Sequence, residues 1–207
     1  IEKVTKASNG KVGYVHIPDM GVEGLNEFVK YYYPQLSKQA LIFEVRGNEG
    51  GNVSSIIIER LRREAAQITI SRNGKPDFEP EGNGPLVMLC DEFSASDGDI
   101  VNYRFKHYKL GKVVGKRTWG GVVGIRGSLP FVDGGTLSKP EFSRYDLEGK
   151  DWIIEGKGVE PDIVVDNDPY LEFTGTDQQL NKGIEVILED LKTKAKSIPN
   201  PPPFPIK

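Results

Sequence analysis

The sequence is poor in the residues that build disulfides and metal sites. It contains one cysteine, Cys90, and two histidines, His16 and His107. One cysteine excludes an intrachain disulfide and a zinc site made of several cysteines, because both need more than one thiol. A single thiol tolerates either redox state, so the cysteine content does not indicate a compartment.

Long apolar runs and clusters of one charge are also missing. No segment approaches the roughly 20 apolar residues that a membrane-spanning helix needs. The formal net charge is −3, and the Lys and Arg residues are scattered, whereas a nucleic-acid-binding protein is expected to carry a basic stripe. The chain starts at Ile1 without Met or a leader-like apolar segment, so we expect a processed or truncated piece of a longer protein.

The 207 residues, 37% of them hydrophobic, suit one large domain or two small ones with a real core. Alternating or continuous apolar runs predict strands, and apolar residues at helical spacing predict helices. The order of these segments favours an α/β domain with parallel or mixed strand pairing. The expected strands are 11–19, 40–45, 85–90 and 111–118, and the expected helices are 22–34, 53–66, 97–108 and 176–196.

Two further segments have their own signatures. The sequence "ITISRNGKPDF" predicts a short hairpin with Asn73 and Gly74 in its turn. Residues 198–207 are proline-rich, and we expect a polyproline II or disordered tail there. No interior linker divides the preceding residues 1–197, so we treat them as one domain.

Two polar turns occur where a predicted buried strand passes into a helix. The turn "EVRGNEGGNVSS" places Gly50 and Gly51 before a helix, and "DEFSASDGD" places Ser94 and Ser96 before the next one. In α/β sheets, ligands collect at the carboxyl ends of strands, and a helix N-terminus offers unpaired N–H groups. These turns therefore suit an oxyanion, with a serine as nucleophile.

Simpler interpretations of both turns stay open. Ser96 can be a helix N-cap, and the glycines can form a tight turn or a phosphate cradle, although neither common phosphate motif is matched. Asp97 and Asp99 could hold a metal, but no histidine or third carboxylate lies nearby in the sequence, so no metal is expected.

Five motifs in order resemble one family. The stretches "GYVHIPDMGVEGLNEF", "EVRGNEGGNVSSIIIERL", "DEFSASDGDI", "LGKVVGKRTWGGVVGI" and "GKGVEPDI" resemble the C-terminal catalytic domain of tricorn-type serine proteases, relatives of the tail-specific proteases that process C-termini. The resemblance covers about residues 11–191. It implies a crotonase-like α/β fold with a mixed sheet, peptide hydrolysis, and no cofactor.

The resemblance also implies roles for individual residues. Ser96 is the expected nucleophile, and Glu155 is the expected acidic member of the catalytic tetrad. The N–H groups of Gly51 and Asp97 are the expected oxyanion donors.

Neighbouring residues are expected to support this site. We expect Gly50, Arg46 and Asn48 to organise the oxyanion turn. Trp119 lines the substrate cleft or packs beside it, and Cys90 is a small core residue.

No motif in this sequence supplies the general base that the reaction needs. Where the tail-specific proteases have a catalytic lysine, this sequence has Gly121, and the family's turn Asp is Glu44 here. His107 lies eleven residues along a helix from Ser96, roughly 16 Å away, and His16 reads as a strand residue with a backbone or carboxylate partner. We expect the base from an upstream histidine-bearing domain, followed by a PDZ-like domain.

Rival functions remain. The same turns could bind a peptide carboxylate or another anion without catalysis, or serve an acyl-CoA enzyme of the crotonase type. For the peptidase, we expect a homo-oligomer in the cytoplasm, with the periplasm as the alternative. The sequence predicts no cleavage preference.

Overall fold

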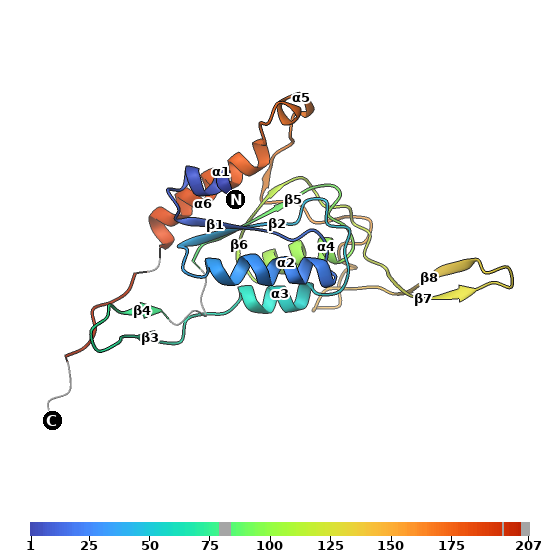
Figure 1. The fold of residues 1–207 in the computed structure, drawn as a ribbon. Helices are drawn as coiled ribbons and strands as arrows, with labels where there is room; N and C mark the ends of the chain where they lie inside the picture. Colours follow the sequence, from blue (N-terminus) through green and yellow to red (C-terminus); the bar gives the residue numbers. More distant parts are fainter. Residues whose placement is uncertain (79–83, 196, 204–207) are drawn as a thin grey trace.

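The computed structural model describes residues 1–78, 84–195 and 197–203, apart from the side chains of Phe78 and of residues 126–129. A five-stranded sheet in the order β1-β2-β5-β6-β9 forms its centre, and every neighbouring pair is parallel (Figure 1). The central strands β2 and β5 are buried along their whole length, which explains their uninterrupted apolar sequences. The strands are β1 (Val12–His16), β2 (Ala40–Glu44), β5 (Leu86–Cys90), β6 (Gly111–Gly115) and β9 (Ile163–Val164).

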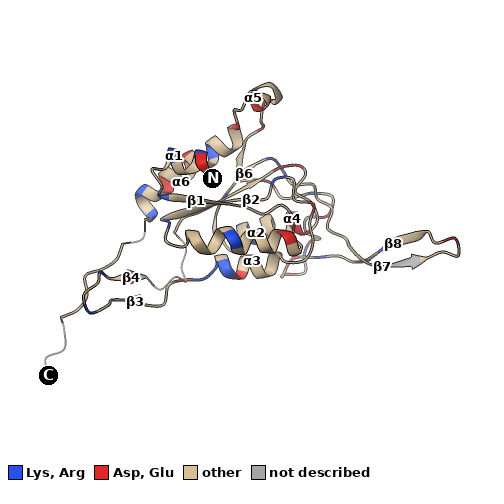
Figure 2. Ribbon diagram, viewed as in Figure 1, with Lys and Arg blue, Asp and Glu red and all other residues tan. Residues whose placement is uncertain are grey.

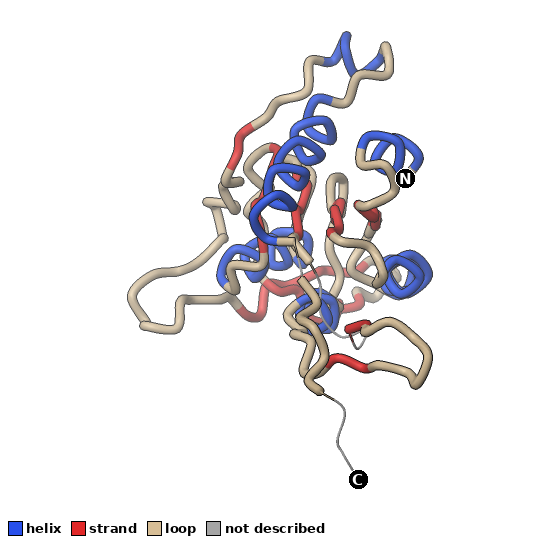
Figure 3. Tube along the Cα trace, turned by 90° about the vertical axis from the view of Figure 1, so that its left-hand side faces the viewer, coloured by secondary structure: helices blue, strands red, loops and turns tan. Residues whose placement is uncertain are grey.

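Helices cover both faces of this sheet, as the two views in Figures 1 and 3 agree. One face packs against α2 (Val22–Tyr32), α3 (Ser54–Leu61) and α4 (Asp97–His107), with Phe43 of β2 in that core. The other face packs against α1 (Glu2–Ala7) and α6 (Gln178–Lys194), with Ile42 in that core. Successive β2 side chains thus enter opposite cores, as the alternation of a strand requires.

The expectation of a mixed central sheet is wrong for the described residues. The connections β1–β2, β2–β5 and β5–β6 contain the helices α2, α3 and α4, and such crossovers join parallel strands. Antiparallel pairing occurs in two separate hairpins. They are β3 (Ile68–Thr69) with β4 (Asp77–Phe78), and β7 (Gly124–Pro130) with β8 (Thr136–Phe142), the latter projecting from the body (Figure 1).

The remaining segments are short. The β3–β4 hairpin confirms the expected one, although its connection spans residues 70–76, so Asn73 and Gly74 sit within a longer loop. A 3-10 turn, η1 (Tyr33–Gln35), follows α2, and α5 (Pro169–Phe173) precedes α6. The proline-rich tail has neither helix nor strand over 197–203, and its residues 204–207 lie outside the described part.

The terminal helix α6 shows how charge is distributed on the surface. Its N-cap Asp177 accepts a hydrogen bond from the Leu180 N–H at 2.9 Å. Its exposed side carries ion pairs one turn apart, such as Lys182 with Glu185, and Figure 2 shows basic and acidic residues interspersed over the helices. Among the described residues, no helix has the length and apolar character needed to cross a membrane.

Candidate active site

Two turns meet at the carboxyl ends of β2 and β5. The turn after β2 spans residues 45–53 and leads into α3, and the turn after β5 spans 91–96 and leads into α4. The Ala95 N–H donates to the Asn48 carbonyl at 2.8 Å, which ties the turns together. A Cβ placed on Gly50 would lie 2.6 Å from the Ser96 Cβ, so only glycine permits this approach.

Ser96 occupies an unusual position at the start of α4. It is the N-cap residue, with φ of 54° and ψ of −117°, and its hydroxyl makes no capping hydrogen bond. A non-glycine residue in the positive-φ region costs on the order of 1–3 kcal/mol, and such residues cluster at functional sites. The half-buried hydroxyl is therefore held at the turn without a partner from the helix end.

Ser94, the other serine of the turn, is fully buried. Its hydroxyl donates to the Val45 carbonyl at 2.8 Å and accepts from the Asp91 N–H at 3.1 Å. These bonds use Ser94 to fold the turn, which leaves Ser96 as the serine with a free hydroxyl.

Two backbone amides beside Ser96 are available to an anion. Within the described part of the chain, neither the Gly51 N–H nor the Asp97 N–H donates a hydrogen bond. The Gly50 N–H, in contrast, is occupied by the Asn48 Oδ1 at 3.0 Å. Gly51 has φ of 144°, and a Cβ there would lie 2.1 Å from the Met20 carbonyl oxygen.

Asn48 is the residue that shapes the glycine turn. Its side chain is fully buried and donates through Nδ2 to the Ile17 carbonyl at 2.9 Å, while its Oδ1 accepts from Gly50. Its own carbonyl accepts from Ala95. One side chain and its backbone thus connect the ends of β1, β2 and β5.

We expect the Arg46 side chain to help organise the oxyanion turn, but its guanidinium binds carboxylates outside that turn. The side chain binds the Glu44 carboxylate at 2.7 Å and forms a two-pronged pair with Asp177, the α6 N-cap, at 2.7 and 2.9 Å. The reason is charge: Arg46 neutralises two carboxylates, one from its own strand and one from α6. Its contribution to the glycine turn is limited to its place in the chain.

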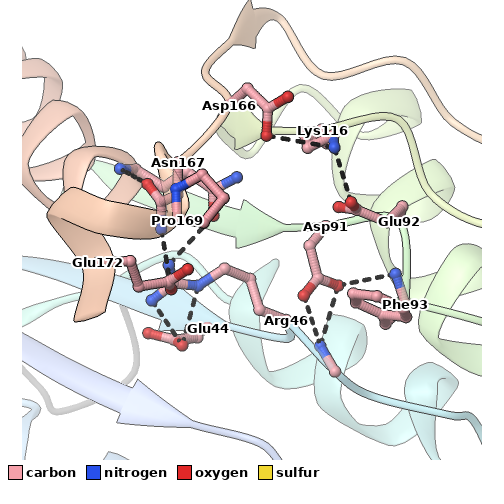
Figure 4. Close-up of a pocket in the computed structure, with 12 residues that line it drawn as sticks. Glu44, Arg46, Asp91, Glu92, Phe93, Lys116, Asp166, Asn167, Pro169 and Glu172 are labelled. Carbon is pink, nitrogen blue, oxygen red and sulfur yellow. Dashed lines mark hydrogen bonds and ion pairs between the residues drawn. The ribbon is translucent and has the colours of Figure 1, made fainter.

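A cavity of about 590 Å³ lies beside this ion network (Figure 4). Its charges are largely paired within the protein, Arg46 as described and Lys116 with Glu92 and Asp166. The Asp91 carboxylate points to the Gly47 N–H and accepts a hydrogen bond from it at 2.9 Å (Figure 4). The cavity adjoins the turns that carry the site. Because its charged side chains are largely paired with one another, it is a surface cleft lined by ion pairs.

Asp97 contributes its backbone and its side chain to different tasks. Its buried carboxylate accepts from the Ser54 N–H at 2.8 Å and from the Ser54 hydroxyl, at the first turn of α3. The Arg104 guanidinium binds the same hydroxyl at 2.8 Å. In the described residues, no group of three His, Cys, Asp or Glu side chains is arranged to hold a metal ion.

Glu155 lies on a loop that packs against the residues after β6. Its Oε2 accepts from the Val122 and Val123 N–H groups at 2.7 and 2.8 Å, and the adjoining Ile154 has φ of 70°. No hydrogen bond of the described residues uses its Oε1. Glu155 is exposed, so this oxygen is open to a partner from outside the chain.

Trp119 lies between these parts of the site. Its backbone N–H donates to the Ser94 carbonyl at 3.0 Å, and the residue is 61% exposed. The ring covers Gly121, where a Cβ would lie 2.4 Å from a ring carbon. Trp119 therefore stands at the rim beside the Ser96 turn.

Neither histidine makes a hydrogen bond to Ser96 in the described structure. His16 is exposed at the end of β1, opposite Glu44 in the strand register, and among the described residues no backbone or carboxylate group hydrogen-bonds to its imidazole. His107 ends α4 and stacks on Tyr103, with ring centroids 6.1 Å apart. Cys90 is buried in the core, and burial raises the pKa of its thiol far above the usual range.

Asp99 is the residue that the sequence-based assignment missed. It is fully buried, and its Oδ1 accepts from the Gly120 N–H at 2.8 Å and from the Thr118 hydroxyl. Burial raises the pKa of its carboxyl, and the Thr118 hydroxyl and nearby backbone N–H groups oppose that rise. The spacing Ser96-x-x-Asp99 at a helix start is a capping-box signal that could have identified it.

Comparisons with known proteins identify the family of the chain. Residues 11–165 match the model of the peptidase family S41. The chain is 40% identical to the tricorn protease of Thermoplasma volcanium over 95% of its own length and 19% of that protein. It is 42% identical to a tricorn protease homolog of Saccharolobus solfataricus, over 92% of its length and 18% of that protein.

A solved structure gives the same result in three dimensions. The crystal structure of the tricorn protease superposes with a TM-score of 0.87 at 38% identity, covering 93% of this chain and 19% of that one. The chain thus spans about a fifth of the length of the relatives that it matches.

Proposed function

The chain belongs to peptidase family S41, a family of serine peptidases, and on that premise we propose that it is the nucleophile-bearing domain of a tricorn-like enzyme. The observation that carries the proposal is Ser96: a serine at positive φ on a helix N-terminus, with a free hydroxyl and unpaired amides beside it. The crotonase-like fold implied by the motifs would supply the same pair of amides, and we propose that classification too.

The proposed reaction is acyl transfer through a covalent intermediate. Ser96 Oγ attacks the peptide carbonyl, and its proton passes to a histidine base. The tetrahedral oxyanion is stabilised by the Gly51 and Asp97 N–H groups, which have no partner among the described residues. The acyl-enzyme then forms as the amine leaves, and water releases it by the reverse sequence.

We propose that the base lies outside these 207 residues. In the part of the chain that the structure describes, neither His16 nor His107 hydrogen-bonds to Ser96, and Gly121 stands where related proteases have lysine. Glu155 would orient the incoming histidine through Oε1, because Oε2 is fixed by two backbone N–H groups. The partners would be a peptide substrate, upstream histidine-bearing and PDZ-like segments, and further copies in a homo-oligomer.

Covalent labelling tests this function. A fluorophosphonate should modify Ser96 in the full-length polypeptide, and peptide mapping should locate the label on that residue. Labelling with hydrolysis of a fluorogenic tripeptide supports the proposal. A folded, full-length protein that neither labels nor hydrolyses would favour a non-catalytic peptide- or anion-binding module.

The origin of the base has its own test. The 207-residue chain alone should turn over the tripeptide very poorly, because a serine hydroxyl without a base is a weak nucleophile at neutral pH. Adding the upstream segment should restore turnover. Robust turnover by the chain alone, abolished by His16→Ala, would identify His16 as the base and reject the split site.

A further inference from the structure

The carboxylate of Asp99 connects the Ser96 turn with the loop after β6. Its Oδ1 accepts from the Thr118 hydroxyl and the Gly120 N–H. Asp99 lies on the first turn of α4, three residues after Ser96. One buried side chain thus contacts both segments.

The start of α4 lacks the serine half of a capping box. In the complete motif, the N-cap serine hydroxyl binds the N–H three residues on, while the acidic residue there binds the N-cap N–H. Ser96 makes no side-chain cap bond, so the helix end does not use its hydroxyl. Asp99 occupies the acidic position, but its hydrogen bonds go to Thr118 and Gly120 of the loop after β6.

Hydrogen bonds through Thr118 and Gly120 also link the Asp99 side chain to the loop that carries Glu155. The Thr118 hydroxyl accepts from the Val159 N–H at 2.8 Å, and the Thr118 N–H donates to the Val159 carbonyl at 3.1 Å. The Gly120 carbonyl accepts from the Gly156 N–H at 2.7 Å. The loop that carries Glu155 is therefore fixed, just after that residue, to groups that Asp99 holds.

The second carboxylate oxygen of Asp99 indicates a role other than capping the helix. Its Oδ2 is buried and has no hydrogen-bond partner among the described residues. Burying an unpaired carboxylate oxygen opposes folding, and a neutral side chain of the same shape would cap with less cost. Stability alone therefore does not account for an aspartate here.

We propose that Asp99 is a positioning residue of the peptidase reaction, an inference that rests on the proposed function. Through Thr118 and Gly120, it sets the place of the start of α4, and with it the Ser96 turn, relative to the Glu155 loop. Misplacing reacting groups by about 1 Å can reduce a rate on the order of 100-fold, so loosening this link should affect the chemical step more than binding.

The test compares four full-length variants with the wild type: Asp99→Asn, Thr118→Val, the double variant and the control Asp146→Asn. Asp146 is a matched control because its carboxylate also accepts backbone N–H bonds, at 2.8 to 3.0 Å, but from an exposed loop. The measurements are kcat, KM and the rate of fluorophosphonate labelling of Ser96, with thermal unfolding as the folding check.

We expect Asp99→Asn to lower kcat and the labelling rate by ~10- to 100-fold with KM within about twofold of wild type. Thr118→Val should give a smaller loss of the same kind, and the double variant should match Asp99→Asn, because the two side chains act through one hydrogen bond. Asp146→Asn should equal wild type.

Several outcomes would overturn the inference. They are a kcat for Asp99→Asn equal to that of Asp146→Asn, losses in the double variant that multiply, or a change confined to KM. If Asp99→Asn does not fold, Thr118→Val decides, and an unchanged kcat there rejects the role. An inert, unlabelled wild type would reject the proposed function itself, and the inference with it.

Discussion

The turns after β2 and after β5 leave neighbouring parallel strands at the same edge of the sheet, yet they solve different problems. The turn after β2 places positive φ on Gly50 and Gly51, where no side chain would fit. The turn after β5 places positive φ on Ser96, where a side chain is needed. The same backbone feature, a positive φ angle, thus presents an amide in one turn and a hydroxyl in the other.

Each turn is held by the other. Asn48 in the first accepts from Ala95 in the second. Asp97, which directly follows the second turn, accepts from the Ser54 N–H at the start of α3, which follows the first. Because the contacts run both ways, strain on Ser96 is balanced by hydrogen bonds made outside its own turn. Substitutions should therefore separate the residue that reacts from those that only hold the turns.

The largest expected effect is on the hydroxyl itself. Ser96→Ala in the full-length enzyme should reduce kcat on the order of 10⁶-fold, the scale seen when a serine protease loses its nucleophile. Fluorophosphonate labelling should vanish, while thermal unfolding stays at or above the wild-type temperature. Near wild-type hydrolysis by this variant would remove Ser96 from the mechanism.

Next in size is the contact between the two turns. Gly50→Ala should lower kcat by roughly 100-fold or more, because its methyl group would displace Ser96 and the nearby amide that we assign to the oxyanion. Gly47→Ala is the matched control, since Gly47 also has positive φ, at 67°, but open space around its Cβ position. Equal losses in both variants would assign the effect to backbone strain alone.

The side chain of Asn48 should have a smaller effect, and mainly on stability. Asn48→Ala removes one buried and one partly buried hydrogen bond and leaves the Ile17 carbonyl and Gly50 N–H without those partners, which costs about 1–3 kcal/mol. Denaturant unfolding of the full-length protein measures the loss. The control is Asn52→Ala, an exposed residue of the same turn. Indistinguishable unfolding of the two variants would contradict the bridging role.

The smallest effect on chemistry is expected at the neighbouring serine. Ser94→Ala should cost about 1–2 kcal/mol of stability, because the buried Val45 carbonyl loses its hydroxyl donor. Labelling of Ser96 should persist at a rate within a few-fold of wild type. A variant that folds normally but no longer labels would mean that Ser94 has the role we assign to Ser96.

The sequence by itself determined the alternation of strands and helices and the position of both turns. Apolar runs such as "ALIFE" and "LVMLC" require burial on both faces, and the glycines and serines that follow them mark turns before helices. These signals are local, because they depend on the period of the chain and on the conformational freedom of single residues.

Only the tertiary structure decided which polar groups pair. Arg46 lies two residues from Asn48, yet it binds Asp177, which is 131 residues away. Asp99 meets Thr118, and Glu155 meets the amides of Val122 and Val123, across separate loops. No local pattern specifies such partners, because a buried charge takes whichever donor the packing of distant segments brings within reach.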